Sequence, residues 1–377
     1  MRGPLEGLKV LELAGLGPAP YACMLLADLG ADVLRLERGD PDAGDEVTQE
    51  ILNRSRPSVA INLKNDAARE LVLELCEQAD VLIEGFRPGV TERLGLGPDA
   101  VMARNPRLVY GRMTGYGQEG PLSQRAGHDI NYISISGALW SIGRENERPV
   151  PPMNLVGDFG GGAMFLVFGV FAALWSAQRT GEGQVVDAAM VDGSASLLSM
   201  MHSLINGGSW QARGTNLLDT GAPFYEVYET KDSQFMAVGA IEAKFYRELL
   251  AGLDVGDDEL PSQWNRDQWP VMKQRFSEIF LTKTRDEWTE IFHDTDACVT
   301  PVLSPREATR HPYNTQRRVF SIGDRPQPSP APRFSKTPGS IGESPRTPGS
   351  GTRVGLASWG VSNERFAELR EAGAFDQ

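Results

Sequence analysis

The chain has 377 residues, of which 41% are hydrophobic and 23% charged, so it can bury a sizeable core and is long enough for two domains. Its formal net charge of -13 argues against binding to nucleic acid or to an anionic membrane, because both partners require a basic surface. Three widely separated cysteines, Cys23, Cys76 and Cys298, favour buried free thiols in a reducing compartment over a disulfide framework.

Neither chain end carries a recognisable targeting signal. Residues 1–4 run directly into a strand-like segment, which predicts that no signal peptide is present. The last residues do not form a peroxisomal ending, so we expect a cytoplasmic protein. The most apolar window, Ala163–Leu174, is shorter than the roughly 20 residues that span a bilayer and predicts a buried helix.

The first 112 residues alternate between strand-like and helix-like segments. Helices are expected at Tyr21–Leu29 and Asp66–Gln78. Strands are expected at Leu8–Leu13, Asp32–Glu37, Ser58–Leu63, Asp80–Glu84 and Arg107–Arg112. This alternation predicts an α/β fold with a Rossmann-like, doubly wound and mostly parallel sheet.

The pattern changes after a long helix that is expected to begin near Asp158. Tyr225–Tyr228 and Phe235–Val238 predict a hairpin, and helices follow at Glu242–Leu250 and from the capping box Thr284-x-x-Glu287 to Phe292. Residues 326–351 are rich in Pro, Ser and Gly, which is typical of an extended crossing, and a short helix is expected at Asn363–Ala372.

These patterns predict two domains of different style. The large domain is expected to contain residues 1–200 and 330–377, and the smaller α+β domain residues 222–318. Residues 201–221 and 319–329 are expected to be linkers.

Two residues are candidates for acid–base chemistry. His128 lies in a polar loop segment after glycine-rich residues 115–121 and is the natural base among four histidines, the alternative being a hydrogen-bonded structural histidine. Asp158 precedes three glycines and an apolar helix, so it is either a simple N-cap or a carboxylate held beside a ligand at the positive helix end. Glu242, by itself, is most simply a first-turn helix acid.

The loops after the predicted strands favour a phosphate ligand. Arg38, Lys64 and Arg87 follow strand ends, with Arg93 nearby, and together they could accept a nucleotide phosphate cluster. Gly15-x-Gly17 follows the first strand, but Pro20 stands in place of the third glycine of a dinucleotide fingerprint, so a tight turn is favoured over NAD binding. No Cys/His cluster has metal-ligand spacing, so no metal is expected.

Several segments resemble the family III CoA transferases. Four indicate the wider family: Gly7–Leu13, Met24–Val33, Phe86–Gly89, and Gly115–Gly117 with Gly120-Pro121. Three more resemble the alpha-methylacyl-CoA racemase branch: Gly127–Tyr132, Gly157-Asp158 and Ala240–Glu242. The distinguishing residue is His128, which the transferases lack. The acidic run Asp40, Asp42, Asp45 and Glu46, within residues 39–56, departs from the family pattern.

The resemblance implies racemisation of 2-methylacyl-CoA thioesters by 1,1-proton transfer through an enolate. His128 and Asp158 would be the two bases, Glu242 would support His128 from the smaller domain of one subunit or the other, and backbone amides near Asp158 would stabilise the enolate. The alternative is a family III CoA transferase that moves CoA between carboxylic acids through an Asp158 acyl intermediate.

The resemblance also implies partners. The protein would be an interlocked homodimer, and CoA would arrive as part of the substrate, so no separate cofactor is expected. The implied CoA contacts are Arg38, Ile61, Asn62, Leu63, Lys64, Gly85, Phe86, Arg87, Arg93, Gly127, His128, Asp129, Ile130, Asn131 and Tyr132.

Overall fold

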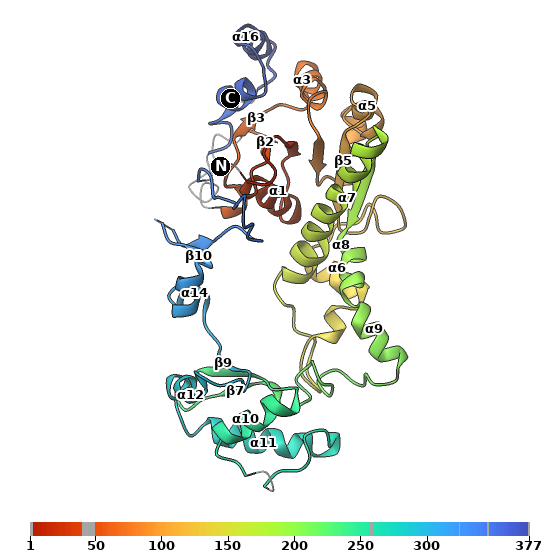
Figure 1. Cartoon of the computed structure of the whole chain (residues 1–377). Coiled ribbons are helices and arrows are strands. Elements are labelled where there is room, and N and C mark those ends of the chain that lie inside the picture. Colours follow the sequence, from red (N-terminus) through yellow and green to blue (C-terminus); the bar gives the residue numbers. More distant parts are fainter. Residues whose placement is uncertain (1–2, 40–49, 257–258, 324, 345–346, 376–377) are drawn as a thin grey trace. The chain divides into compact units, whose positions relative to one another are not determined.

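The computed structural model describes residues 3–39, 50–256, 259–323, 325–344 and 347–375, so the acidic run at positions 40–46 lies outside the described residues. The chain divides into two compact units. The first unit contains Met1–Ser136, Met153–Leu198 and Phe320–Gln377, and the second contains Gly137–Pro152 and Ser199–Val319. Both chain ends therefore lie in the first unit (Figure 1). This division differs from the expected boundaries mainly at residues 137–152 and 201–221, which belong to the second unit.

Six strands of the described chain form one parallel sheet in the first unit, in the order β3-β2-β1-β4-β5-β6. They are β1 (Lys9–Leu13), β2 (Asp32–Glu37), β3 (Ser58–Ala60), β4 (Val81–Glu84), β5 (Val109–Thr114) and β6 (Val185–Ala189). This is the order of a doubly wound fold, which confirms the predicted α/β class. The first five strands match the sequence prediction within a few residues, whereas β6 was not predicted.

Apolar side chains of the strands point alternately to the two faces of this sheet. Along β1, Val10 packs on one face, and Leu11 and Leu13 pack on the other. Helices on the Leu11 face are α3 (Asp66–Cys76), α5 (Pro98–Arg104), α15 (Thr352–Ser358) and α16 (Asn363–Glu371), and those on the Val10 face include α1 (Pro18–Asp28) and α7 (Met164–Thr180). Burial on both faces explains why the strands read as nearly continuous apolar runs.

The apolar helix differs from its sequence prediction. In the described part of the chain, the helical stretch Leu155–Thr180 is long and apolar enough to cross a membrane by length and composition alone, with a mean hydropathy of 1.7. The expectation of a buried helix is wrong, because only 33% of its apolar window is buried within the chain. Leu166, Val170 and Ala173 pack on the sheet while other apolar side chains of α7 remain exposed.

The Pro-rich segment is extended, as predicted, and forms hydrogen bonds with both members of a buried ion pair. It includes β11 (Gln327–Pro328), which pairs with β10 (Phe320–Ser321). Arg54 pairs with Asp28 at 2.5 Å and also donates to the backbone oxygen of Pro328 at 3.0 Å. The backbone amide of Ser340 in turn donates to the oxygen of Asp28 at 2.9 Å, so the segment is bound at both of these points.

The second unit is an α+β structure. The predicted hairpin forms from β7 (Tyr225–Glu229) and β8 (Phe235–Gly239), and an unpredicted third strand, β9 (Val299–Pro301), pairs with β8. Its helices include α9 (Ser199–Asn206), α10 (Ala243–Gly252), α11 (Trp269–Phe280), α12 (Arg285–Phe292), α13 (Pro305–Ala308) and α14 (Pro312–Arg317). The predicted capping box of Thr284 and Glu287 is present at the start of α12.

The cysteines follow the sequence prediction in part. Cys23 and Cys76 are buried free thiols, whereas Cys298 is exposed, contrary to expectation. Cys298 stands immediately before β9 with a φ of 53°, and its side chain lies outside the core of the second unit.

Candidate active site

A cavity of about 500 Å³ opens at the carboxyl ends of β1, β4 and β5. The sheet order reverses between β1 and β4, which is the point where open α/β sheets bind their ligands. The cavity wall consists of residues from the loops that follow β1, β4 and β5, together with residues of later segments: Gly15–Pro18, Gly85–Pro88, Met113–Tyr116, Ser123, Arg125–His128, Tyr132, Asp158 and Met190. The wall therefore contains both predicted bases.

A larger cavity of about 630 Å³ lies elsewhere in the first unit, beside Leu8, Asp80 and Arg107 at the amino ends of the strands. Neither His128 nor Asp158 is part of its wall. We assign the active site to the smaller cavity, because position relative to the strand ends and the presence of titratable groups indicate a site more reliably than volume.

His128 lies directly before helix α6 (Asp129–Ser136) and is exposed on the cavity wall. Its backbone oxygen accepts the first-turn amides of Asn131 at 2.8 Å and Tyr132 at 3.3 Å. Its own amide donates to Oδ1 of Asn131 at 3.0 Å. The start of α6 thus fixes the backbone of His128 and leaves the imidazole ring facing the cavity.

Tyr132 holds the loop before His128 in place. Its hydroxyl donates to the backbone oxygen of Gly127, and burial raises its pKa to about 12, so the phenol remains a donor at neutral pH. A Cβ atom at Gly115 would lie 2.1 Å from the Tyr132 ring, and one at Gly127 would lie 2.8 Å from it. Glycine is required at both positions because the ring occupies the space of a side chain.

Asp158 is not an N-cap. It lies inside a π-helical segment, η3 (Leu155–Ala163), whose N-cap residue is Asn154. The Asp158 amide donates to Oδ2 of Asp129 at 2.7 Å, and its carboxylate accepts a hydrogen bond from Asn154 Nδ2 at 3.1 Å. π-Helical segments are rare in proteins, and they occur frequently at functional sites.

The turn after β1 makes room for the Asp158 carboxylate. Gly17 has a φ of 68°, and a Cβ atom there would lie 3.3 Å from Oδ2 of Asp158. Pro18 then begins α1, three residues earlier than the sequence predicted. The glycine motif that resembles a dinucleotide fingerprint therefore has a local function next to Asp158.

Burial raises the pKa of the Asp158 carboxyl above its usual value, and the neighbouring negative charge of Asp129 raises it further. The hydrogen bond from Asn154 and the charge of His128 act in the opposite direction. The net rise means that this carboxyl keeps its proton to a higher pH than an exposed aspartate. The shift makes the protonated form of Asp158 more accessible, as a group that both delivers and accepts a proton requires.

The glycines after Asp158 have a different role from the one expected. A Cβ atom at Gly161 would lie 2.6 Å from the amide nitrogen of Ser194, and one at Gly193 would lie 1.8 Å from the Gly161 oxygen. Both contacts join η3 to helix α8 (Met190–Leu197). These glycines therefore allow two helical backbones to approach each other, rather than allowing a ligand to approach.

The structure brings together some of the expected contact residues. Gly85, Phe86, Arg87, Gly127, His128, Tyr132 and Asp158 line the cavity. Asp129, Ile130 and Asn131 form the first turn of α6 beside it. Arg38 follows β2, Ile61 to Lys64 follow β3, and Arg93 ends the short helix α4 (Val90–Arg93).

The segment after β3 is a turn rather than the end of the strand. The Asn62 amide donates to the oxygen of Ala374 at 2.9 Å, and its side chain accepts the amide of Lys64 at 3.1 Å. Glu242 lies in the second unit as the N-cap residue of α10, with an exposed side chain that forms no capping hydrogen bond.

Sequence reasoning missed several residues of the site. Asn154 was not identified, although its spacing of four residues from Asp158 is a helical-turn signal. Asp129 was expected to contact CoA, but its buried carboxylate accepts the Asp158 amide. Arg125 lies on the cavity wall, and its position three residues before His128 in a glycine-containing loop was the available signal.

Comparison with known proteins agrees with this geometry. A protein named "Alpha-methylacyl-CoA racemase" from Mus musculus is 46% identical over 97% of this chain and 96% of its own length, and its namesake from Homo sapiens is 45% identical over the same shares. A crystal structure of a CAIB/BAIF family protein from Brucella suis shares the fold, with a TM-score of 0.81, 23% identity, and coverage of 95% of this chain and 100% of that one. The family model "CoA-transferase family III" matches residues 5–353, and the chain belongs to this family.

Proposed function

We propose that this protein is an alpha-methylacyl-CoA racemase, which inverts the carbon next to the thioester carbonyl of a 2-methylacyl-CoA. The observation that carries the proposal is that His128 and Asp158, supplied by two different segments, lie on the wall of one cavity at the carboxyl ends of the strands. The similarity to the two racemases over nearly the full chain supports the same activity.

Racemisation requires one group to remove the proton at C2 and another to return a proton to the opposite face. An ionised Asp158 takes the proton of one enantiomer, while a protonated His128 delivers its proton, and the roles exchange for the other enantiomer. The raised pKa of Asp158 brings its proton affinity closer to that of an imidazole, which favours a reversible exchange.

The enolate oxygen requires hydrogen-bond donors. The amides of Asp158 and Phe159 are already used, by Asp129 at 2.7 Å and by the Asn154 oxygen at 3.4 Å, so they are poor candidates for the role expected from the sequence. In the first turn of α6, the amides of Asn131 and Tyr132 already donate to the His128 oxygen. The amides of Asp129 and Ile130 precede them, at the helix start where backbone donors have no intrahelical acceptor. We assign the enolate to these two amides, each worth about 2.7–4 kcal/mol to the transition state when well placed.

The CoA moiety is proposed to lie along the carboxyl edge of the sheet. Gly85 to Arg87 are already part of the cavity wall, and Arg38, Ile61 to Lys64 and Arg93 follow neighbouring strands or loops at the same edge. The basic side chains of Arg38, Lys64, Arg87 and Arg93 are exposed and would meet the phosphates.

A homodimer is part of the proposal. Apolar side chains are exposed along α7, with Phe168 at 73% and Trp175 at 64%, and Ile135 and Leu197 are also exposed. Surfaces of this kind in a single chain mark contact regions, and a second copy in the interlocked arrangement is the proposed cover. Glu242 is retained as the carboxylate that supports His128, on the basis of the Ala240–Glu242 resemblance.

The test is deuterium incorporation at C2 of a single-enantiomer 2-methylacyl-CoA in deuterated water. Wild-type protein should incorporate deuterium and lose optical purity, and His128→Ala should slow both by at least about 10²-fold, as expected for loss of a general base. His293→Ala is the matched control, because His293 is exposed in the second unit.

The transferase alternative predicts a different outcome. Acyl transfer to an added carboxylic acid, with a hydroxylamine-sensitive Asp158 intermediate and no deuterium exchange, would reject the racemase proposal. Equal rates for His128→Ala and wild type would reject the role of His128.

A further inference from the structure

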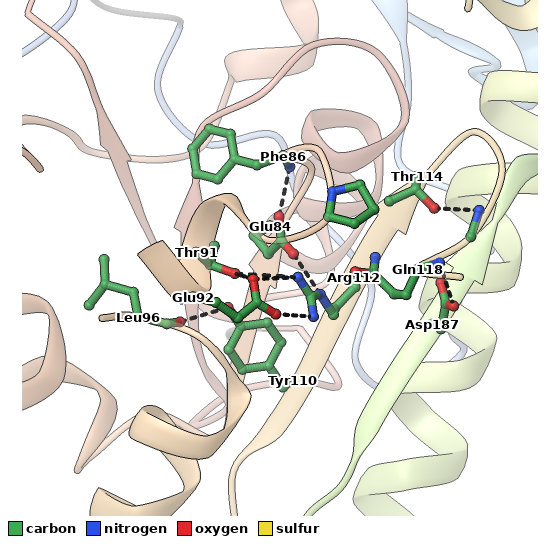
Figure 2. A network of polar contacts seen from close by, with 12 residues as sticks. Glu84, Phe86, Thr91, Glu92, Leu96, Tyr110, Arg112, Thr114, Gln118 and Asp187 are labelled. Atoms are coloured by element: carbon green, nitrogen blue, oxygen red, sulfur yellow. Dashed lines mark hydrogen bonds and ion pairs between the residues drawn. The ribbon is translucent and has the colours of Figure 1, made fainter. Parts of the chain in front are cut away.

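Beneath the loop after β4, one arginine joins two acidic residues from different elements (Figure 2). Arg112 on β5 donates from Nε to Oε1 of Glu84 at 2.9 Å. From Nη1 it donates to Oε1 of Glu92 on α4 at 2.7 Å. Glu84 is 0% exposed and Arg112 is 6% exposed, so the ion pair between them is shielded from solvent.

Glu84 connects this arginine to the cavity wall. Its second oxygen, Oε2, accepts the backbone amide of Phe86 at 2.7 Å, as Figure 2 shows. Gly85, Phe86 and Arg87 belong to the wall that also contains His128 and Asp158. The carboxylate thereby fixes the direction in which the chain leaves β4.

The other end of the same segment is also attached to Arg112. Thr91 Oγ1 and Glu92 Oε2 accept from Nη2 at 3.4 Å and 3.3 Å, and both residues belong to the single turn of α4. Gly89, with a φ of 82°, begins this turn, and a Cβ atom there would lie 3.2 Å from Nη1 of Arg93. Residues 84–92 thus run from one acidic partner of Arg112 to the other.

We propose that Arg112 is a positioning residue for the nucleotide part of the substrate: through Glu84 and Glu92 it sets residues 85–93 in the shape that presents Arg87 and Arg93 to the CoA phosphates. The inference rests on the proposed acyl-CoA substrate. Lysine cannot replace arginine here, because a single ammonium group lacks the planar fork that reaches both acids and Thr91 at once.

The test uses Arg112→Lys, which keeps a positive charge beside buried Glu84, and Glu92→Gln, which removes the half-exposed partner only. The dissociation constant of CoA is measured by calorimetry. The rates for a 2-methylacyl-CoA and for the same acyl group on pantetheine, which lacks the nucleotide, are measured by deuterium exchange. Arg104→Gln is the matched control, since Arg104 also bridges two glutamates, Glu70 and Glu77, at an exposed site outside the cavity wall.

We expect Arg112→Lys to weaken CoA binding by about tenfold, comparable with the loss of one phosphate contact, and Glu92→Gln to weaken it less. The KM of the CoA thioester should rise with kcat nearly unchanged, and the pantetheine thioester should react as with wild type. Arg104→Gln should change none of these values.

Unchanged CoA affinity in Arg112→Lys, or equal losses for the CoA and pantetheine thioesters, would overturn the positioning role. The calorimetric measurement needs no turnover, so tight CoA binding without deuterium exchange would count against the racemase proposal alone. Wild-type protein that does not bind CoA would overturn both.

Discussion

Removing the Asp129 carboxylate should separate the positions of the two proposed bases. Asp129 begins α6, directly after His128, and its carboxylate accepts the Asp158 amide from η3 at 2.7 Å. The residue is 6% exposed, so water cannot replace this acceptor without local opening. Asp129→Ala would leave the Asp158 amide unpaired, and Asp129→Asn would keep an acceptor of the same shape without its charge.

The magnitude follows from the burial and charge of this hydrogen bond. A hydrogen bond to a charged group contributes about 1.5–3 kcal/mol, so Asp129→Ala should lower the free energy of unfolding by about this amount. A shift of Asp158 by about 1 Å relative to His128 can reduce kcat by about 10²-fold. Asp129→Asn should show a smaller loss on both measures.

The assays are urea denaturation and deuterium exchange at C2, with the pH dependence of kcat/KM measured for wild type and Asp129→Asn. The negative charge of Asp129 raises the pKa of Asp158, so its removal should shift the profile limb that reports Asp158 to lower pH. Wild-type kcat in Asp129→Ala, or a shift of that limb to higher pH in Asp129→Asn, would refute the reasoning.

Two further predictions concern stability. Because the pKa of Asp158 is raised in the folded chain, its contribution to stability is present at low pH and is lost as the pH rises through the folded-state pKa. Asp158→Asn should therefore abolish exchange yet melt at a higher temperature than wild type at neutral pH, and a lower melting temperature would contradict this. Arg54→Leu should lower the unfolding free energy by about 3–5 kcal/mol in urea titrations, because it leaves Asp28, 2% exposed, as an uncompensated buried charge. The double variant Asp28→Leu/Arg54→Leu should recover most of the lost unfolding free energy. If the double variant loses as much unfolding free energy as Arg54→Leu, the cause is not the uncompensated charge of Asp28.

Local sequence patterns were sufficient to predict many strands and helices of the first unit. The apolar runs of β1, β2 and β4 are buried on both faces, and this requirement is visible in a sequence window of a few residues. The capping box of Thr284 and Glu287 was equally predictable, since both of its hydrogen bonds lie within one helical turn. His128 and Asp158 could be proposed because their neighbours resemble those of a known family.

Elements that depend on distant partners were not predictable. Strand β6 pairs with β5 although its first residue is exposed and Asp187 interrupts the apolar run, so the neighbouring strand determines its conformation. Strand β9 is only three residues long and exists through pairing with β8. Such pairings are a property of the assembled sheet, not of the local chain.

The environment of Asp158 also combines a locally predictable part with a part that depends on distant residues. From the local sequence, Asp158 precedes three glycines and an apolar helix, which left open an N-cap or a carboxylate held beside a ligand. The folded chain instead places this residue in the π-helical segment η3, with Gly161 packed against Gly193 of α8 and the Asp158 amide bound to Asp129. The physical reason is that the backbone conformation and the proton affinity here depend on the burial and charge of groups far away in the chain, which local propensities do not contain.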